Sequence, residues 1–218
     1  MTEESNYVWR DPGAISKVAV VVLTVGAIAH GVDVILDFGF GPASDYKTAT
    51  DDLLDHPLQV MHVLADLTLL ALLLGAIPLV IWILTVSRNA HTFTKRSIEK
   101  PWWAAVWWYL IPIISVYKPY VSMCEIWDVS APDLKARALN RNVLNIWWMA
   151  FIVAGGMAVF SNFGAVYNGI FNLASLIRTV AFIVIVRRVC AMQRQKQIAE
   201  TFGENTQASV SVLERLNG

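Results

Sequence analysis

The sequence predicts an all-α, polytopic membrane protein, and three observations lead to this fold class. Hydrophobic residues make up 56% of the 218 residues and charged residues 16%, against about 45–50% and about 25% in soluble proteins. Four apolar runs approach the ~20 residues that a helix needs to cross the hydrocarbon core. The 17 basic residues are distributed very unevenly between the loops. This composition excludes a disordered chain, a basic nucleic-acid-binding protein and a disulfide-stapled secreted module.

The first predicted span is Val18–Phe38, which is apolar as far as Ala29. It is longer than the apolar region of a cleavable signal peptide and follows a leader of mixed charge, so we expect it to be retained. The second predicted span, Leu67–Ser87, contains Pro78. A proline inside a spanning helix predicts a kink, which neighbouring helices make tolerable.

The third and fourth predicted spans are Val143–Phe160 and Gly169–Val186. Only the short segment SNFGAVYN separates them. A connection of this length favours antiparallel neighbours, so these two helices are expected to form a tight hairpin.

One further apolar segment, Pro101–Val121, is long enough to span but carries Pro112, Lys118 and Pro119. Two prolines this close together break a straight helix into pieces. The basic residues decide whether the segment crosses, because they concentrate on the cytoplasmic side of short loops.

If Pro101–Val121 does not cross, fifteen of the 17 basic residues share one side of the membrane, Lys47 is alone on the other, and Arg178 is inside the fourth span. If it does cross, six basic residues lie on one side and ten on the other. The first distribution is far more polarised, so we predict four spans with both chain termini in the cytoplasm.

Residues 1–190 are then a single transmembrane domain and residues 191–218 a cytoplasmic tail, which is expected to be polar and frayed from about Thr201. The Gly39–His56 loop, which is rich in Gly, Pro, Ser and Asp, faces the outside. The expected location is the cell (inner) membrane, with the lipid bilayer as the first partner. A protein partner at the cytoplasmic face and a homo-oligomer are the other expected interactions, and no nucleic acid is expected.

The broken segment, taken as residues 101–127, is predicted to form a re-entrant or interfacial helix on the cytoplasmic face. Tryptophan suits the headgroup layer because its ring is apolar and its N–H is polar. The segment either anchors the protein in the interface or lines a cytoplasmic vestibule. The residues of this motif are Trp102, Trp103, Trp107, Trp108, Pro112, Pro119, Glu125 and Trp127.

The same part of the chain resembles the bacterial membrane family known as domain of unknown function 4328. The residues that carry the resemblance are Arg88-Asn89-Ala90, the tryptophan cluster as far as Pro112, Pro119-Tyr120, Met123, Glu125-Ile126-Trp127 and Ser130. The resemblance covers roughly residues 60–190. It implies a bacterial membrane protein with several spans, and it implies no reaction.

A polar stripe follows the outer half of the first two spans. His30, Asp33 and Asp37 fall at i, i+3 and i+7 on one helix face, and Gln59, His62 and Asp66 repeat this spacing. Since the two helices are antiparallel neighbours, these faces are expected to meet. At 1.5 Å per residue, the Cα of Arg178 lies about 14 Å from the cytoplasmic edge. Its long side chain is expected to pair with Asp33.

This intramembrane polar cluster (His30, Asp33, Asp37, His62, Asp66 and Arg178) has two interpretations. Ionisable residues inside a membrane usually pair with one another, so the cluster is either a structural ion pair with wetted carboxylates or a proton or ion pathway. No cofactor is predicted. A divalent metal is the one candidate, with His30, Asp33, Asp37, His62 and Asp66 as ligands.

No catalytic residue is predicted, because the sequence has no GxSxG, P-loop or HExxH motif. Cys124 and Cys190 are isolated and are expected to stay reduced. The favoured function is a non-enzymatic scaffold or accessory subunit that binds a partner or lipid through its cytoplasmic face. The alternatives are a small transporter or ion-conducting protein that uses the polar cluster, and an intramembrane metal-dependent enzyme.

Overall fold

The computed structural model describes residues 8–39, 57–93, 103–108, 111, 114–139, 141–160 and 165–217. For residues 36–37, 39, 57–74, 160, 165, 204–205 and 207–217 it describes the backbone alone. The described residues form helices and no strands, which confirms the all-α class.

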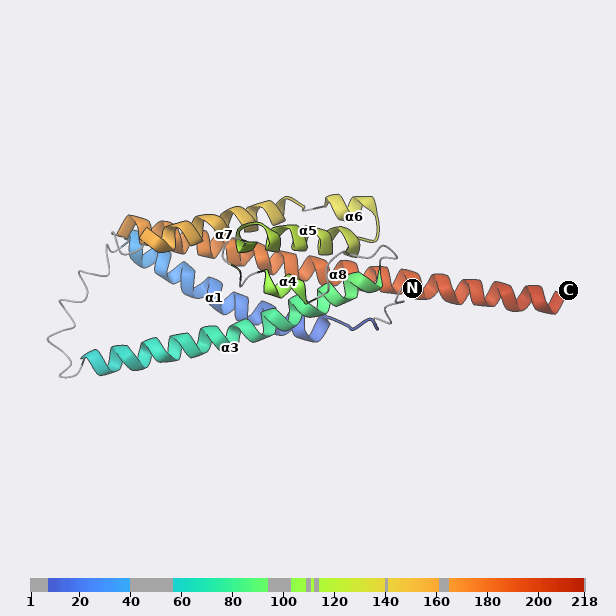
Figure 1. The fold of residues 1–218 in the computed structure, drawn as a ribbon, viewed down its shortest axis with the longest axis horizontal. Helices are drawn as coiled ribbons and strands as arrows, with labels where there is room; N and C mark the ends of the chain where they lie inside the picture. Colours follow the sequence, from blue (N-terminus) through green and yellow to red (C-terminus); the bar gives the residue numbers. More distant parts are fainter. Residues whose placement is uncertain are drawn as a thin grey trace.

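Four long helices make up the body of the molecule (Figure 1): α1 (Gly13–Gly39), α3 (Pro57–Thr92), α7 (Asn142–Phe160) and α8 (Ala165–Asn217). They alternate in direction along the chain. Helices α1 and α7 both pack against α8 over much of their length. The predicted hairpin of the third and fourth spans is present as α7 and α8.

Three stretches of helix are long and apolar enough to cross a membrane: Gly13–Ile35, Leu134–Val159 and Val166–Gly203. Many large apolar side chains of α1 point away from the protein; Val25, Ile28 and Ile35 are each more than 60% exposed. A surface of this kind is stable in lipid and not in water. The chain is therefore a helical membrane protein.

The second predicted span, Leu67–Ser87, lies within α3, which continues through Pro78 without interruption. The side chains of residues 67–74 lie outside the described part, so the crossing of the membrane by this helix stays a prediction.

The segment between α3 and α7 is broken, as its prolines predicted. Its described residues form a single helical turn α4 (Ala104–Trp107), a short 3₁₀ turn η1 (Ile114–Val116) and α5 (Lys118–Ser130). Pro119 occupies the first turn of α5, where its missing N–H costs nothing. Trp102 and Pro112 lie outside the described residues.

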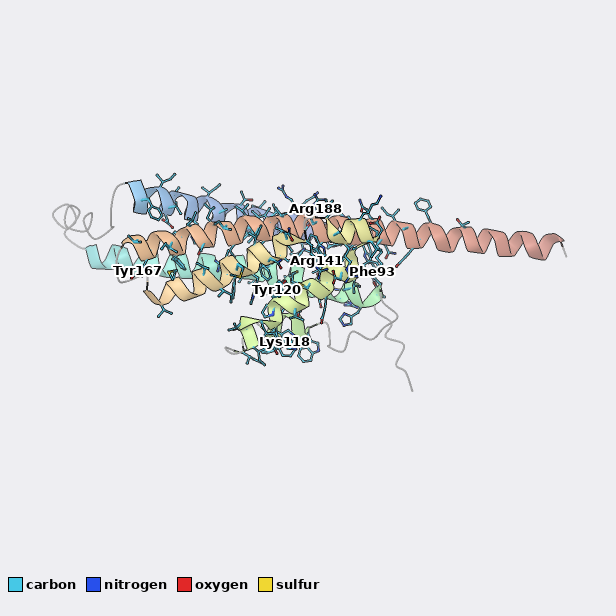
Figure 2. The ribbon with its side chains drawn as sticks, turned by 90° about the horizontal axis from the view of Figure 1, so that it is seen from above. Phe93, Lys118, Tyr120, Arg141, Tyr167 and Arg188 are labelled. Atoms are coloured by element: carbon cyan, nitrogen blue, oxygen red, sulfur yellow. The ribbon has the colours of Figure 1, made fainter. Side chains whose placement is uncertain are left out.

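A short helix α6 (Leu134–Ala138) follows α5. Its N-cap residue is Asp133, whose side chain accepts a hydrogen bond from the backbone N–H of Ala136 at 2.7 Å. Helices α5 and α6 cover one end of the bundle. We call α4, η1, α5 and α6 together the cap. Figure 2 shows Tyr167 at the opposite end of the bundle from Phe93 and Arg188, which lie near the cap.

The prediction of a frayed tail is wrong. Helix α8 continues without a break to Asn217 and extends far beyond the rest of the bundle (Figure 1). The physical reason is composition, because residues 191–217 contain no proline and a single glycine, Gly203, among many Gln, Glu, Arg and Ala residues. These residue types have high helix propensity.

The buried core is concentrated at the capped end of the bundle. Trp82 and Val86 of α3, Ile185 and Val189 of α8, and Trp127 of α5 are all fully buried there. Toward the uncapped end, large apolar side chains of the described residues, such as Ile35, Val159 and Val166, are exposed.

Candidate functional site

The predicted polar stripe on α1 is only partly engaged inside the protein. His30 Nδ1 lies 3.4 Å from Asn172 Oδ1 of α8, and its ring meets Phe171 edge-on with the centroids 6.4 Å apart. Asp33, one turn further, is exposed. The side chains of Asp37, His62 and Asp66 lie outside the described part of the chain.

Helices α1 and α3 approach each other near Gly75, where an added Cβ would lie 3.1 Å from Val22 Cγ1. Beyond that point the two helices diverge, and their outer ends are well apart in Figure 1. The outer parts of α1 and α3, which carry the predicted polar stripe, therefore lie at the same height along the bundle but apart from each other. Among the described residues, no three His, Cys, Asp or Glu side chains are placed to hold a metal. The metal site stays a prediction, because the side chains of three of its five proposed ligands lie outside the described part of the chain.

The expected ion pair between Arg178 and Asp33 is not formed among the described residues. Helices α1 and α8 are antiparallel, with Asp11 paired to Arg194 at 2.8 Å and His30 beside Asn172. In this register Arg178 is level with about residue 25 of α1, so Asp33 lies roughly 12 Å further along the axis. The distance of each residue from the membrane edge does not determine which residues pair, because pairing also depends on the register between α1 and α8.

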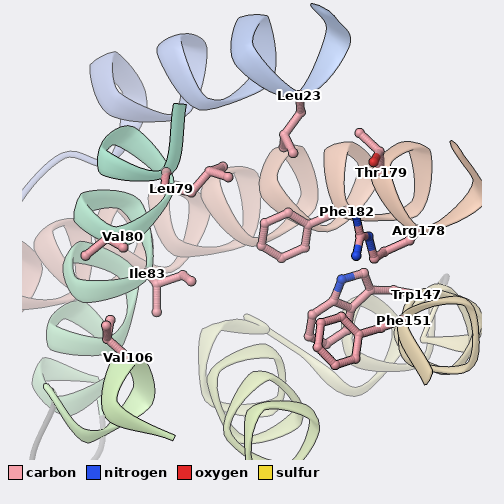
Figure 3. Close-up of a pocket in the computed structure, with 11 residues that line it drawn as sticks. Leu23, Leu79, Val80, Ile83, Val106, Trp147, Phe151, Arg178, Thr179 and Phe182 are labelled. Carbon is pink, nitrogen blue, oxygen red and sulfur yellow. The ribbon is translucent and has the colours of Figure 1, made fainter. Parts of the chain in front are cut away.

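Arg178 instead lines a cavity of about 340 Å³ in the interior of the bundle. Helices α1, α3, α7 and α8 contribute to its wall, and Val106 of α4 borders it on the side of the cap. The residues that line the cavity (Figure 3) are Leu23, Ala76, Leu79, Val80, Ile83, Val106, Trp147, Phe151, Arg178, Thr179 and Phe182.

Among the described residues that line the cavity, Arg178 is the one that carries a charge. Its guanidinium group points toward Phe182 and Trp147 in Figure 3, and the guanidinium carbon lies 6.0 Å from the centroid of the Phe151 ring. An arginine at the centre of a spanning helix costs at least about 2.5–3.5 kcal/mol on insertion scales. The cation–π contact with the Phe151 ring stabilises the buried charge by about 0.5–2 kcal/mol. The contact with Phe151 therefore does not fully offset the free-energy cost of burying the Arg178 charge.

A chain of aromatic contacts holds this wall in place. The ring of Phe182 is stacked on Trp147 with the centroids 5.4 Å apart and meets Trp82 edge-on at 5.6 Å. On the other side Trp148 is stacked on Phe151 at 4.9 Å. Rings packed in this way fix the rotamers of the wall, so the cavity is a formed site in a rigid part of the fold.

A second polar site lies at the capped end, where the side chains of Asn89 and Gln193 are both fully buried. Asn89 Nδ2 donates to Gln193 Oε1 at 3.1 Å and to the carbonyl oxygen of Arg10 at 2.7 Å. Gln193 Nε2 donates to the carbonyl oxygen of Val86 at 2.9 Å and to Ser130 Oγ at 3.0 Å. Two amides thus join the N-terminal segment, α3, α5 and α8.

Several motif residues of the cap are buried and structural. The indole N–H of Trp127 donates to the carbonyl oxygen of Arg137 at 2.9 Å and thereby ties α5 to α6. Pro119 is buried, and Glu125 is half-buried. In contrast, Trp103 and Trp107 are exposed, and Trp108 lies under the ammonium group of Lys118, 5.6 Å from the ring centroid.

Basic residues at the capped end are used within the protein as well as at its surface. Asp128 forms ion pairs with Arg137 at 2.7 Å and with Arg141. Burial opposes ionisation of Asp128, but the hydrogen bonds from Arg137 and then Arg141 outweigh it, so its pKa lies below 3.8. Lys196 donates to the carbonyl oxygen of Val129 at 2.7 Å. The ion pairs of Asp128 join α5 to α6 and to the start of α7, and Lys196 attaches α5 to α8.

The fold and its apolar outer surface define the chain as an all-helical membrane protein with a capped helix bundle. The chain belongs to the family described as domain of unknown function (DUF4328), whose model matches residues 54–198. This confirms the resemblance. The match contains the Asn89–Gln193 network and most of the cavity wall, and it leaves out α1. No curated protein and no solved structure matches the chain.

Two sets of important residues were missed in the sequence. Gln193 continues the buried stripe of Phe182, Val186 and Val189 on α8, and an amide on such a stripe predicts a buried polar partner. Trp147, Phe151 and Phe182 give no sequence signal beyond their hydrophobicity, because the cavity they border depends on how α1, α3, α7 and α8 pack together.

Proposed function

We propose that this DUF4328 protein is a non-enzymatic membrane scaffold or accessory subunit that binds a protein partner through the cytoplasmic end of α8. Four spans, with the capped end and both termini in the cytoplasm of the bacterial cell, are part of the proposal. The enrichment of basic residues at the capped end supports this orientation, because basic residues stay on the cytoplasmic side.

The observation that carries the proposal is the exposed apolar face at the base of the projecting helix. Ile198 is 56% exposed and Phe202 is 69% exposed. The two side chains are four residues apart and lie on one face of α8. Large apolar side chains of this kind, on a helix that has left the bundle among polar residues, are typical of a binding surface.

The base of the projecting helix is held firmly, which favours binding. Arg194 pairs with Asp11, Gln193 is locked by Asn89 and Ser130, and Lys196 reaches Val129. A surface that is already ordered loses little conformational entropy when a partner binds. The network therefore supplies a defined direction for the helix.

The cap supplies a membrane anchor in this proposal. Trp103 and Trp107 are about half exposed, and Lys118 lies over the rings of Trp108 and Tyr117. Figure 2 shows Lys118 on the edge of the molecule that faces away from α1. Exposed indole rings and lysine ammonium groups suit the headgroup layer, where the surroundings are partly apolar and partly wet.

The test is site-specific photocrosslinking in living cells. A photoreactive phenylalanine analogue at position 202 is expected to give one discrete adduct. The same analogue at Glu200, which faces roughly the opposite way on the helix, serves as the matched control. The adduct at 202 is expected to weaken at least severalfold when Ile198→Ser is added. Equal adducts at 200 and 202, or none at 202, would contradict the proposal.

A further inference from the structure

The Arg178 cavity is independent of the cytoplasmic surface proposed above, and its chemistry points to a ligand. Its wall combines aliphatic side chains of α1 and α3 with the aromatic side chains Trp147, Phe151 and Phe182. Of the described lining residues, Arg178 alone is charged. A cavity of about 340 Å³ falls within the range of about 300–1,000 Å³ found for small-molecule sites. A wall of this composition suits a hydrocarbon chain with one anionic end.

The position of Arg178 favours a ligand that comes from the lipid. The cavity is open to the outside of the protein. It is bordered by α1, α7 and α8, which contain stretches apolar enough to cross a bilayer, and by α3, whose crossing is part of the proposed topology. Its guanidinium points toward Phe182, which is nearer to the capped end than Arg178 itself (Figure 3). Phe182 is five residues from Arg187, or about 8 Å along the helix axis. The charge therefore lies below the cytoplasmic headgroup layer and within reach of an amphiphile whose chain is in the membrane.

We propose that the cavity binds a long-chain fatty acid, with its carboxylate on Arg178 and its alkyl chain along the wall formed by Leu23 and Leu79. A guanidinium group and a carboxylate form two parallel hydrogen bonds, and this geometry needs only one arginine. One cation and a single cavity match one carboxylate and one chain. A phospholipid carries a phosphodiester and two chains, and a partner helix presents a convex surface, so both fit the concave site less well.

The probe is a stearic acid brominated in mid-chain, added to the purified full-length protein in detergent micelles. Bromine quenches nearby indole fluorescence, and Trp147 lies in the wall. We expect saturable quenching that falls in the Trp147→Phe variant. The brominated alcohol of the same chain length is expected to bind at least about tenfold more weakly, because it lacks the charge that pairs with arginine.

Two substitutions test the site from opposite sides. Arg178→Gln is expected to weaken binding about tenfold or more. Arg178→Lys should weaken it by less, because lysine keeps the positive charge but cannot form the two parallel hydrogen bonds of a guanidinium group. Leu79→Trp leaves Arg178 in place and fills the cavity, so saturable quenching should disappear while the thermal midpoint stays within a few degrees. The matched control is Arg187→Gln, an exposed arginine on the same helix, which should bind like the wild type.

The proposal is overturned if the acid and the alcohol quench equally, or if Leu79→Trp retains full saturable quenching. It is also overturned if brominated phosphatidylglycerol competes better than the fatty acid, since the ligand would then be a phospholipid. If Arg178→Gln does not fold, the Leu79→Trp variant and the comparison of acid with alcohol decide the question alone.

Discussion

The side chains of Asn89 and Gln193 are hydrogen-bonded to each other at 3.1 Å although they are 104 residues apart in the chain. Both are fully buried, and each also bonds to backbone carbonyl groups of other segments. This pair, and not the tryptophan cluster, is the point at which the cap, α3, α8 and the N-terminal segment meet.

Gln193→Leu should destabilise the protein, because it leaves buried donors and acceptors of Asn89, Val86 and Ser130 without partners. Each buried unsatisfied group costs about 1–3 kcal/mol. At roughly 2–4 °C per kcal/mol for a chain of this size, the thermal midpoint in detergent should fall by at least about 4 °C. Gln197→Leu, four residues further along the same helix and closer to the surface, should change the midpoint by less than half as much. Equal effects of the two substitutions would show that the network is not important for stability.

Asp128→Asn should remove the ion pairs of Asp128 with Arg137 and Arg141 and lower the thermal midpoint by about 2–3 °C at pH 7, since partly exposed pairs contribute up to about 1 kcal/mol. The pKa of Asp128 is below 3.8 in the folded protein. A lowered pKa means that the stabilisation is complete above the unfolded pKa and is lost as the pH falls through the folded one. The difference between variant and wild type should therefore be constant from pH 7 to pH 5 and shrink below about pH 4.

Asp133→Asn is the matched control for this pH series. Asp133 caps α6 through its side chain, and asparagine caps a helix about as well as aspartate. Its thermal midpoint at pH 7 should equal that of the wild type. A difference for Asp128→Asn that grows as the pH is lowered would contradict the assigned role of the ion pairs.

Gly169→Ala should disturb the contact between α8 and the end of α1, because the added Cβ would lie 2.5 Å from Phe38 Cζ. The ring of Phe38 is 57% exposed and must move aside, so the substitution should cost less than the ~1–3 kcal/mol of overpacking in a closed core. Gly156→Ala is the control, since an added Cβ meets nothing within 4 Å there and the gain in helix propensity is the same. The double variant Gly169→Ala/Phe38→Ala should regain the midpoint of Phe38→Ala alone. A midpoint for Gly169→Ala equal to that of Gly156→Ala would refute the contact.

The membrane topology is testable with single cysteines in a background with Cys124→Ala and Cys190→Ser. Leu134 on α6 is 79% exposed, whereas Ser130 is fully buried and unsuitable for labelling. A membrane-impermeant maleimide should label Ser44→Cys in intact cells and Leu134→Cys only after permeabilisation. Labelling of both positions in intact cells would exclude the four-span topology.

The helices and their hydrophobic character were predictable because apolar runs and prolines act locally. The break in Pro101–Val121 followed from the geometry of proline, and the α7–α8 hairpin from the short connection between two apolar runs. The family was recognisable from spacing around Asn89, Pro119 and Trp127. In the structure these three positions are buried, and Asn89 and Trp127 also form hydrogen bonds between segments of the chain.

Arg178 shows what could not be predicted. Its distance along the helix from Arg187 follows from the sequence, but its partner depends on the register of α8 against α1 and on which helix faces it. Those quantities come from side-chain packing across four helices and leave no periodic signal. The continuation of α8 was not predicted for a different reason. A polar segment can still be helical, because Gln, Glu, Arg and Ala favour a helix.

The uninterrupted course of α8 has a mechanical consequence. About thirty residues of α8 follow Arg187, and at 1.5 Å per residue they form an arm roughly 45 Å long. In the proposed topology this arm lies in the cytoplasm and the preceding part of α8 lies in the bilayer. Spanning helices adjust their tilt when membrane thickness changes. A tilt of about 10° would then move the tip by about 8 Å, so a change in the lipid would displace a cytoplasmic surface.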